Sequence, residues 1–351
     1  MAFLSIPNVS IRGIAVCVPN RVVENRSLDY FTQEEIESVI SMTGIERRYV
    51  ADEHTTCSDL CEKAFNELIE RLGWDRESID AIIYLSMTED HPQPNTACIL
   101  HGRLGLSEDC YVSNLKQGCP GWIVGMSTLS ALVSTGQIKR AVLMNGDINT
   151  RNSSPYDKES QPLFSDAGAV TALEYNPDAP LIEYYIATRG KDSGAIICPA
   201  GGARQPVTAE VLEFKVYEDG SRRRDIDTRM DGMSVFSFGI SAAPKAMKKL
   251  WDHFSIDPES IEKYFFHQAN HFMNEKIRKK LKISEEKVPY ILKNVGNSSS
   301  ASIPENIVVS CRDEFESKSM DCIGCSFGVG LQYGAIHFKT ERIVCPELIM
   351  Y

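Results

Sequence analysis

The segment QGCPGWIVGMSTLSALVSTGQI, residues 117–138, decides the fold because it contains no charged side chain. The part from Gly121 to Val133 would form a helix that is apolar on every side. A helix without a polar face belongs in the interior of a protein. The interspersed serine, threonine and glycine residues argue against a membrane span, and they let neighbouring backbones approach closely. We therefore predict a central, buried helix here.

Strand-like runs alternate with helical patterns around this segment. Residues 80–86, 111–114 and 140–145 are short apolar runs of the kind expected for buried strands. Residues 58–72 repeat apolar side chains on one helical face, and Gly73 follows as a stop signal. This alternation indicates an α/β fold.

The second half of the chain resumes the alternation after two polar stretches. These stretches, residues 151–161 and 219–231, are predicted surface excursions. We predict three more helices and three more strands: helices at 241–254, 270–281 and 304–316, and strands at 167–173, 264–266 and 328–337. We place the boundary between two halves of similar size at residue 175, which gives domains 1–175 and 176–351.

The composition excludes several classes of protein. Apolar residues make up 43% of the 351 positions and charged residues 24%, which excludes general disorder and low-complexity fibres. The 37 lysines and arginines against 48 aspartates and glutamates give a net charge of −11, so the positive field that binds nucleic acid or anionic membranes is missing. The stretch MAFLSIP lacks the basic start and apolar run of a secretory signal. We therefore expect a cytoplasmic protein with neither nucleic-acid nor membrane partners.

The eleven cysteines are expected to be free thiols. Most lie within apolar segments, such as Cys17 among residues 14–18, where a reduced cysteine behaves as a small apolar side chain. Cys322 and Cys325 form one CxxC motif, but a zinc site would need a second pair and a redox site a helix directly after a strand. We expect neither a metal nor a redox cofactor.

Cys119 is the first candidate for chemistry. It stands where a strand-like run ends and the uncharged helix begins, with Pro120 expected at the first helical position. A thiol at a helix N-terminus lies at the positive end of the helix dipole, which favours the thiolate and lowers the pKa of the thiol. We therefore expect a nucleophile, although a packed core cysteine would fit the same pattern.

Three further segments could complete a site around this thiol. His267 lies between an aromatic strand and a helix, where its imidazole can face a cleft or remain a satisfied core histidine. Asn297 lies in a turn of small residues, where helix capping would also explain it. Residues 326–330, SFGVG, offer backbone N–H groups that could face an oxyanion. The order Cys, His, Asn also occurs in papain-like hydrolases, which would require a secreted, disulfide-bonded chain with the thiol near its start.

The strings around these residues resemble β-ketoacyl-acyl-carrier-protein synthase III, a family of thiolase-fold condensing enzymes. Seven strings carry the resemblance: QGCPG at 117–121, FHQAN at 266–270, GNSSSASIP at 296–304, FGVG at 327–330, VPNRVV at 18–23, TGIERR at 43–48 and FSDAGA at 164–169. The resemblance implies a thiolase-like five-layered α-β-α-β-α fold of two halves related by a pseudo-two-fold axis, usually as a homodimer. The uncharged helix after Cys119 would then lie in the middle layer.

The resemblance also implies a mechanism. The Cys119 thiolate would take an acyl group from a thioester, with the N–H groups of Cys119 and Val329 as oxyanion hole. His267 and Asn297 would donate to the carbonyl of a malonyl thioester, so that loss of CO₂ leaves a stabilised enolate that attacks the acyl group. Two alternatives use the same scaffold: acyl transfer to an alcohol or amine without a new carbon–carbon bond, and a non-catalytic partner subunit. The intact trio favours condensation.

The sequence departs from the family at four positions that ordinarily bind coenzyme A. Where typical members have a Trp, an Arg, an Asn and a second Arg, this chain has Ser38, Met42, Met233 and Phe272. Loss of the aromatic stacking and of the cationic phosphate contacts should weaken coenzyme A binding by a few kcal/mol in total, on the order of the usual strength of such contacts. We therefore expect an acyl carrier protein as donor, or an unusual acyl group.

Two further sites follow from the resemblance. A basic stretch could dock an acidic carrier protein by complementary charge, although a solvated helix face would look the same; its residues are Lys276, Arg278, Lys279 and Lys280. Gln93 precedes Pro94 at the position of an acyl-pocket phenylalanine that the family carries at its dimer interface. The polar Gln93 could admit a hydroxylated or branched acyl chain.

Overall fold

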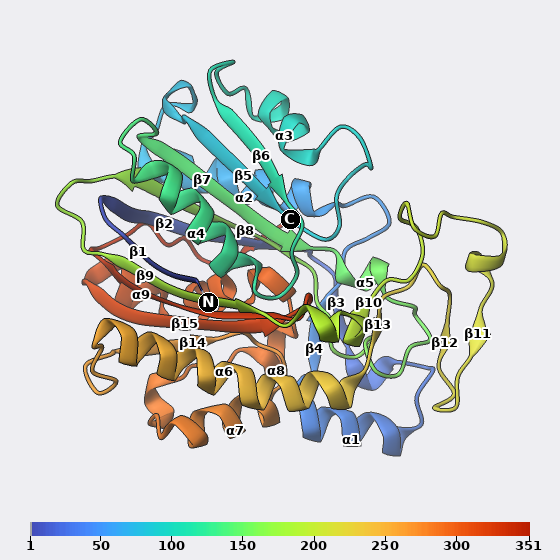
Figure 1. Ribbon diagram of the computed structural model, residues 1–351. Coiled ribbons are helices and arrows are strands. Elements are labelled where there is room, and N and C mark those ends of the chain that lie inside the picture. The colour runs from blue at the N-terminus through green and yellow to red at the C-terminus, as the bar shows by residue number, and fades with distance from the viewer. Residues whose placement is uncertain (1) are drawn as a thin grey trace.

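The computed structural model describes residues 2–351 as two stacked β-sheets with helices between and outside them (Figure 1). The six-stranded sheet has the order β17 (Ile349–Met350), β2 (Val9–Val18), β8 (Ala167–Tyr175), β7 (Arg140–Asp147), β5 (Ala81–Leu85) and β6 (Tyr111–Leu115). The five-stranded sheet has the order β1 (Ala2–Ile6), β9 (Ile182–Thr188), β16 (Gln332–Thr340), β15 (Met320–Gly328) and β14 (Lys263–Phe266).

Helices form the other three layers. The six-stranded sheet is covered on its outer face by α2 (Cys57–Leu72) and α3 (Thr96–Leu104), and the five-stranded sheet by α6 (Gly232–Phe254), with α7 (His271–Leu281) beside it. Two helices, α4 (Gly121–Val133) and α9 (Ser302–Ser317), lie between the sheets. The predicted five-layered α-β-α-β-α fold is therefore confirmed.

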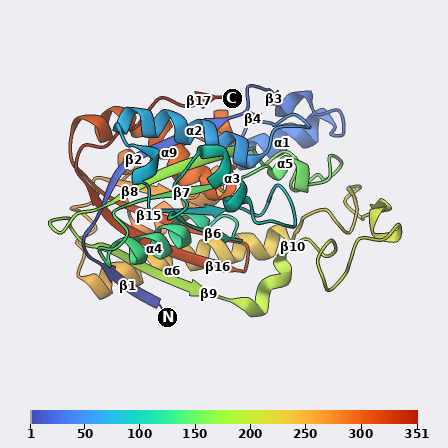
Figure 2. The same cartoon turned by 90° about the horizontal axis from the view of Figure 1, so that it is seen from above.

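Shorter elements decorate these layers. They are α1 (Gln33–Thr43), α5 (Asn149–Asn152), α8 (Leu292–Val295), β3 (Val22–Glu24), β4 (Arg47–Tyr49), β10 (Ile196–Ile197), β11 (Lys215–Val216), β12 (Arg222–Arg223) and β13 (Arg229–Met230). Viewed from above, the loops that carry β11 and β12 extend beyond one end of the layers (Figure 2).

The uncharged helix α4 is buried between the two sheets, as its composition predicts. Trp122 shows how it joins them. Its indole N–H donates to the Thr171 hydroxyl in β8 at 3.0 Å, and its ring meets Phe338 of β16 edge-on. Burying so large an aromatic side chain against both sheets stabilises their stacking.

Parallel strands bring the ends of distant segments together at one edge of the layers. Strands β5, β6 and β7 are mutually parallel, so their carboxyl ends share one edge of the six-stranded sheet. In the other sheet β14 is parallel to β15. Ligands bind at such carboxyl edges in open α/β sheets, so this edge is where a site is expected.

Most predicted elements agree with the structure, and one strand is wrong. The predicted strand at 328–337 contains the end of β15, a turn and the start of β16. Gly330 in the turn has φ of 135°, a conformation that L-residues rarely adopt, so the chain reverses there. Helix α6 begins at Gly232 rather than at 241, because Asp231 caps it by accepting from the Ser234 N–H at 3.0 Å.

The predicted boundary between residues 175 and 176 falls between β8 and β9. Each half of the chain contributes one strand to the sheet of the other half. Strand β1 pairs with β9 in the sheet of the second half, and β17 pairs with β2 in the sheet of the first. The two halves are therefore joined by strand pairing as well as by the middle layer. The boundary itself stays a prediction.

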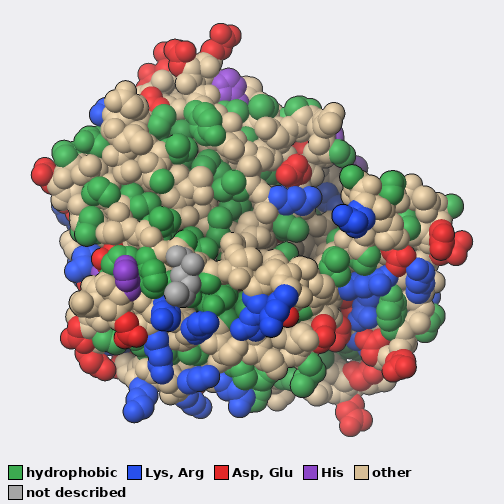
Figure 3. Space-filling model, viewed as in Figure 1, with side chains coloured by type: hydrophobic (Ala, Val, Ile, Leu, Met, Phe, Trp, Pro, Cys, Tyr) green, Lys and Arg blue, Asp and Glu red, His purple; other side chains and the backbone are tan. Residues whose placement is uncertain are grey.

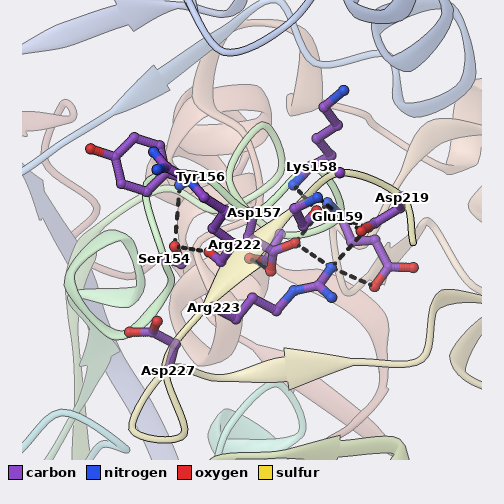
Figure 4. Close-up of polar contacts among 12 residues, drawn as sticks. Ser154, Tyr156, Asp157, Lys158, Glu159, Asp219, Arg222, Arg223 and Asp227 are labelled. Atoms are coloured by element: carbon purple, nitrogen blue, oxygen red, sulfur yellow. Dashed lines mark hydrogen bonds and ion pairs between the residues drawn. The ribbon is translucent and has the colours of Figure 1, made fainter. Parts of the chain in front are cut away.

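The two polar stretches pack against each other, and a few of their charged side chains are buried between them. The Arg223 side chain is 8% exposed, and its Nη2 lies 2.7 Å from Asp157 and 3.1 Å from Asp219 (Figure 4). The Ser154 hydroxyl donates to the Arg222 carbonyl at 2.6 Å. Because a buried cation is stable only when paired, the charges that suggested exposure instead hold the two loops together.

All eleven cysteines are free in the structure. Within residues 2–351, no cluster of three His, Cys, Asp or Glu side chains could hold a metal ion, and no helix is long and apolar enough to cross a membrane.

Candidate active site

A cavity of about 1070 Å³ opens where the strands of both sheets end. Its walls are mostly apolar and come from both halves of the chain, with α1, α6 and residues 196–207 on the entrance side. Cys119, His267 and Asn297 all line it. The structure thus brings the three side chains predicted for catalysis into one space.

Cys119 lies in the turn between β6 and α4. The Gly121 N–H donates to the Gly118 carbonyl at 2.7 Å, and the Ser326 hydroxyl donates to the Cys119 carbonyl at 2.8 Å. Helix α4 begins at Gly121, so Pro120 directly precedes the helix rather than occupying its first position. Both hydrogen bonds hold the nucleophile's backbone in place.

Gly328 lets the end of β15 approach the nucleophile. A Cβ at this position would lie 2.7 Å from Cys119 Cβ and 2.9 Å from its Sγ. Any larger residue would displace the thiol, so glycine is needed here for space.

The pKa of the Cys119 thiol is raised to about 11, so the predicted lowering is wrong. Burial of the sulfur is the main cause, and the nearby Asp147 adds to it. Hydrogen bonds from the Ser299 hydroxyl and from the N–H groups of Cys119 and Val329 act in the opposite direction. The dipole argument failed because it left out the cost of removing a thiolate from water. At neutral pH the Cys119 side chain is therefore a thiol.

Two backbone donors surround the sulfur. The N–H groups of Cys119 and Val329 both lie close enough to the Cys119 sulfur to favour its anion. Two such donors are what an oxyanion hole at this sulfur would require. These are the two residues predicted for it.

His267 follows β14 and is buried in the cavity wall. Its backbone N–H donates to the Cys325 carbonyl at 2.8 Å, and the Phe327 ring meets the imidazole edge-on. Burial lowers the pKa of the imidazole to about 3. The side chain is therefore neutral at physiological pH.

Ser302 orients the imidazole ring of His267. Ser302 Oγ lies 2.7 Å from His267 Nδ1, and it accepts from the Gln268 backbone N–H at 3.4 Å. If the hydroxyl donates to Nδ1, the proton of the neutral imidazole lies on Nε2, which is then a donor.

Asn297 is held from both sides. Its backbone N–H donates to the Leu163 carbonyl at 3.0 Å, and its carbonyl accepts from the Ser165 N–H at 2.9 Å. The side-chain Oδ1 accepts from the Ser299 N–H at 2.9 Å. With Oδ1 occupied, the Nδ2 group remains to donate into the cavity.

Three residues of the site were missed from the sequence. Ser302 orients the imidazole, while Ser299 and Asp147 adjoin the nucleophile. The serines lie inside a quoted small-residue string, which the sequence suggested only for capping. Asp147 ends an apolar strand, and a charged residue at that point is a signal that could have found it.

The predicted docking residues divide into two groups. Lys276, Lys279 and Lys280 are exposed on α7. Arg278 is not a free surface charge, because its side chain is 11% exposed and its Nε lies 2.6 Å from Glu275 Oε1. A docking role for Arg278 would first require this ion pair to break.

Helix α6 adds to the basic surface. Lys245, Lys248 and Lys249 are exposed on this helix, which packs beside α7. Figure 3 shows lysine and arginine side chains gathered over the lower helices of the view. Because α6 and α7 are separated in sequence, only the fold brings these charges together.

Gln93 is exposed and does not line the cavity of its own chain. The predicted acyl pocket at Gln93 involves a second subunit, so this role stays a prediction.

Two of the four positions at which coenzyme A contacts were expected line the cavity with apolar side chains. Met42 and Met233 line the cavity and are 54% and 77% exposed. Phe272 stacks on Phe236 with 5.9 Å between ring centroids, and Ser38 is exposed. Exposed apolar side chains at an entrance favour contact with an apolar surface over a nucleotide phosphate.

Two segments of the chain match the sequence models of one protein family. Residues 114–190 match "3-Oxoacyl-[acyl-carrier-protein (ACP)] synthase III", and residues 252–340 match its C-terminal part. The term 3-oxoacyl is equivalent to β-ketoacyl. The β-ketoacyl-[acyl-carrier-protein] synthase III of Symbiobacterium thermophilum is 28% identical over 341 residues, which cover 97% of this chain and 100% of that one. The same enzyme of Syntrophomonas wolfei is 27% identical over 335 residues, covering 95% and 98%.

Solved structures agree with these matches. The 3-oxoacyl-(acyl-carrier-protein) synthase of Burkholderia xenovorans has a TM-score of 0.93 and 32% identity, covering 100% of this chain and 99% of that one. The β-ketoacyl-[acyl-carrier-protein] synthase III of Thermus thermophilus has a TM-score of 0.81 and 25% identity, covering 94% and 98%. The similarity therefore spans both sheets and the whole cavity.

Proposed function

The chain belongs to the 3-oxoacyl-[acyl-carrier-protein] synthase III family, and we propose that Cys119, His267 and Asn297 perform its reaction. The enzyme condenses an acyl thioester with a malonyl-carrier thioester, releases CO₂ and gives a β-ketoacyl thioester. The observation that supports these residue roles is their convergence on one cavity from distant parts of the chain. Acyl transfer without a new carbon–carbon bond is not favoured, because the relatives are condensing synthases.

The first half-reaction loads an acyl group onto Cys119. The sulfur attacks the thioester carbonyl, the N–H groups of Cys119 and Val329 stabilise the oxyanion, and the donor thiolate leaves. Because burial raises the pKa of the thiol to about 11, the proton must leave as the sulfur attacks.

The second half-reaction makes the carbon–carbon bond. His267 Nε2 and Asn297 Nδ2 donate to the thioester carbonyl of the malonyl group, so the electrons left by CO₂ form a stabilised enolate. The enolate carbon attacks the acyl carbonyl, and the bond from that carbonyl to Cys119 breaks. A neutral imidazole suits this step, because its N–H can stabilise the enolate oxygen by donating a hydrogen bond, and no proton has to be released from a charged imidazolium.

The acyl donor is proposed to be a carrier protein rather than free coenzyme A. The apolar entrance at Met42 and Met233 supports this choice, and so do the exposed lysines of α6 and α7. Carrier proteins are acidic, so this basic surface would steer their approach. Changing Lys279 and Lys280 to Glu should weaken turnover with a carrier-bound donor and spare turnover with a minimal thioester. Equal losses with both donors would contradict the docking surface.

The proposed assembly is a homodimer in which each subunit consists of the two halves 1–175 and 176–351. Strand β6 is the edge of its sheet, with Tyr111 51% exposed, and Thr128 and Ala131 form an exposed stripe on the otherwise buried α4. An unpaired edge strand beside a small-residue stripe suits an isologous contact. We assign the nucleophile to residues 1–175 and the other two catalytic residues to residues 176–351.

Intact-protein mass spectrometry tests the proposal. Purified protein is mixed with acyl-carrier or acyl-coenzyme A donors and then chased with malonyl-carrier protein. We expect an acyl adduct that maps to Cys119 and is discharged with release of CO₂. The Asn297→Ala variant should form the adduct but discharge it slowly. Discharge by an alcohol or amine alone would instead support simple acyl transfer, and no adduct with any donor would contradict catalysis by Cys119.

A further inference from the structure

A buried carboxyl lies behind the nucleophile and has no part in the mechanism above. Asp147 is the last residue of β7 and is fully buried. Its Oδ1 accepts from the Met87 N–H at 2.7 Å and from the Ser86 hydroxyl at 3.0 Å. Its Oδ2 is buried without a hydrogen-bond partner among residues 2–351. A buried carboxyl oxygen without a donor is costly and calls for an explanation.

Ser299 lies between this carboxyl and the nucleophile. Its hydroxyl lies 3.9 Å from Cys119 Sγ, and it is near enough to the Asp147 carboxyl to lower the pKa of that carboxyl, although the two form no hydrogen bond in the resting structure. The backbone of Ser299 has φ of 55°, a left-handed conformation that is uncommon for residues other than glycine. The hydrogen bond from its N–H to Asn297 Oδ1 stabilises this strained turn, which places the hydroxyl beside the Cys119 sulfur.

We propose that Asp147 accepts the proton of the Cys119 thiol through the Ser299 hydroxyl when the acyl group is loaded. The proposal rests on Cys119 being the acylated nucleophile. As the sulfur electron pair forms a bond to the thioester carbonyl carbon, its proton moves to Ser299 Oγ, and the proton of that hydroxyl moves to Asp147. When the oxyanion collapses, the bond from carbon to the donor sulfur breaks. The departing thiolate takes the proton back from Asp147 by way of Ser299, so no proton is consumed.

The acidities in the cavity favour this acceptor over the imidazole. Burial is the main cause that raises the pKa of Asp147 to about 7, and burial lowers the pKa of His267 to about 3. Transfer from the same thiol to Asp147 is therefore favoured over transfer to His267. The ionisable groups that face Asp147 are Cys119 from the α4 side and Asp166 from the segment before β8, and Asp166 raises its pKa further. Neither carries a positive charge that would prevent the carboxyl from taking up a proton.

The proposed role of Asp147 and a purely electrostatic role predict opposite effects of Asp147→Asn on the reaction rate of Cys119. If Asp147 acted only through its charge, Asp147→Asn would remove a repulsion and lower the pKa of the Cys119 thiol, so the thiol would react faster. If Asp147 is the proton acceptor, the same change slows the reaction. The two roles therefore predict opposite results.

The test measures alkylation of Cys119 by iodoacetamide, and acyl loading from a carrier-bound donor, between pH 5.5 and 9.5. Modification is mapped to Cys119 by mass spectrometry, because other cysteines are exposed. We expect the wild-type rate to rise until about pH 7, as the Asp147 carboxyl becomes ionised and able to accept the proton. Above this pH the rate should level off, because transfer of the proton from the thiol to the carboxylate leaves the net charge of the pair unchanged. Asp147→Asn and Ser299→Ala should lose the plateau and react about 10²-fold more slowly at pH 7.5, in the usual range for general-base assistance.

Ser300→Ala is the matched control, because it alters the neighbouring serine without touching Cys119 or Asp147. Its profile should equal that of the wild type. If Asp147→Asn fails to fold, loss of the plateau in the Ser299→Ala profile decides, because loss of the hydrogen bond from Ser299 to the sulfur would by itself lower the rate without removing the plateau. A wild-type profile in Ser299→Ala, or faster reaction in Asp147→Asn, would overturn the proposal. Because alkylation needs no thioester, it still decides the question if no donor acylates the enzyme, a result that would count against the proposed function instead.

Discussion

Glu305 offers a direct test of how burial sets the charge state of the middle layer. It lies in α9, is 1% exposed, and its Oε2 accepts from the Ser298 hydroxyl at 2.5 Å. Its Oε1 is buried without a hydrogen-bond partner among the described residues. Burial raises the pKa of this carboxyl to about 8. The side chain is therefore mostly protonated at neutral pH.

The effect of pH on stability follows from the two states of this group. Because the folded pKa lies above the ordinary value of 4.5, the folded state binds more protons between pH 4.5 and 8. The stabilisation from protonated Glu305 is present below pH 4.5 and is lost as the pH rises through this window. The loss is about 2 kcal/mol at pH 6 and about 4 kcal/mol at pH 8, a difference of about 2 kcal/mol.

The substitution Glu305→Gln removes this dependence, because the amide keeps an acceptor for Ser298 and does not ionise. Relative to the wild type, the variant should gain about 2 kcal/mol of unfolding free energy between pH 6 and pH 8. Urea unfolding followed by circular dichroism at fixed protein concentration measures the change. Glu341→Gln, at an exposed glutamate, is the control and should show no such gain. An equal difference from wild type at both pH values would refute the assignment of a protonated carboxyl.

Three further outcomes follow from the site and its surroundings. Gly328→Ala should slow acyl loading by about 10²-fold, because the new Cβ would displace the Cys119 thiol, and quenched-flow mass spectrometry measures it; loading at the wild-type rate would show that the thiol has room. Arg223→Ala should lower the unfolding free energy by about 3–5 kcal/mol, because it leaves Asp157 buried without its cation. The double variant Arg223→Met, Asp157→Leu should lose less unfolding free energy, because no unpaired charge remains. Equal losses for the two variants in urea titrations would contradict this. The discharge of acyl-enzyme by malonyl-carrier protein should show no inflection near pH 6.5 between pH 5 and 8, because the pKa of His267 is lowered to about 3; an inflection there would mean that the imidazole is charged in the working enzyme.

The layered fold could be predicted because its signals are local and strong. The uncharged segment around Trp122 has only one place in a globular protein, and the apolar runs before and after it have the lengths of buried strands. The wrong strand at 328–337 has a local cause as well, since the turn at Gly330 interrupts residues that are apolar on both sides. The strands and the turn have similarly apolar residues there and differ in backbone conformation, so an apolar pattern alone does not reveal the turn.

The charge states of the site could not be predicted from sequence. The dipole argument for Cys119 considered one favourable term, whereas the pKa depends on how much water the fold removes from the sulfur. Arg278 looked like a surface charge because its partner Glu275 and its burial are set by packing. Asp147 and Ser299 come from segments about 150 residues apart by sequence number, so only the fold shows that they meet.

The crossing of β1 and β17 has a consequence for dissecting the molecule. If the polypeptide were cleaved between β8 and β9, each fragment would keep one edge strand that belongs to the other fragment's sheet. The pieces would then be complementary, and co-expression should reconstitute them through strand exchange, while either one alone would present an open sheet edge and tend to aggregate. Reconstitution would also place the thiol on one fragment and the imidazole on the other, so restored activity would report reassembly.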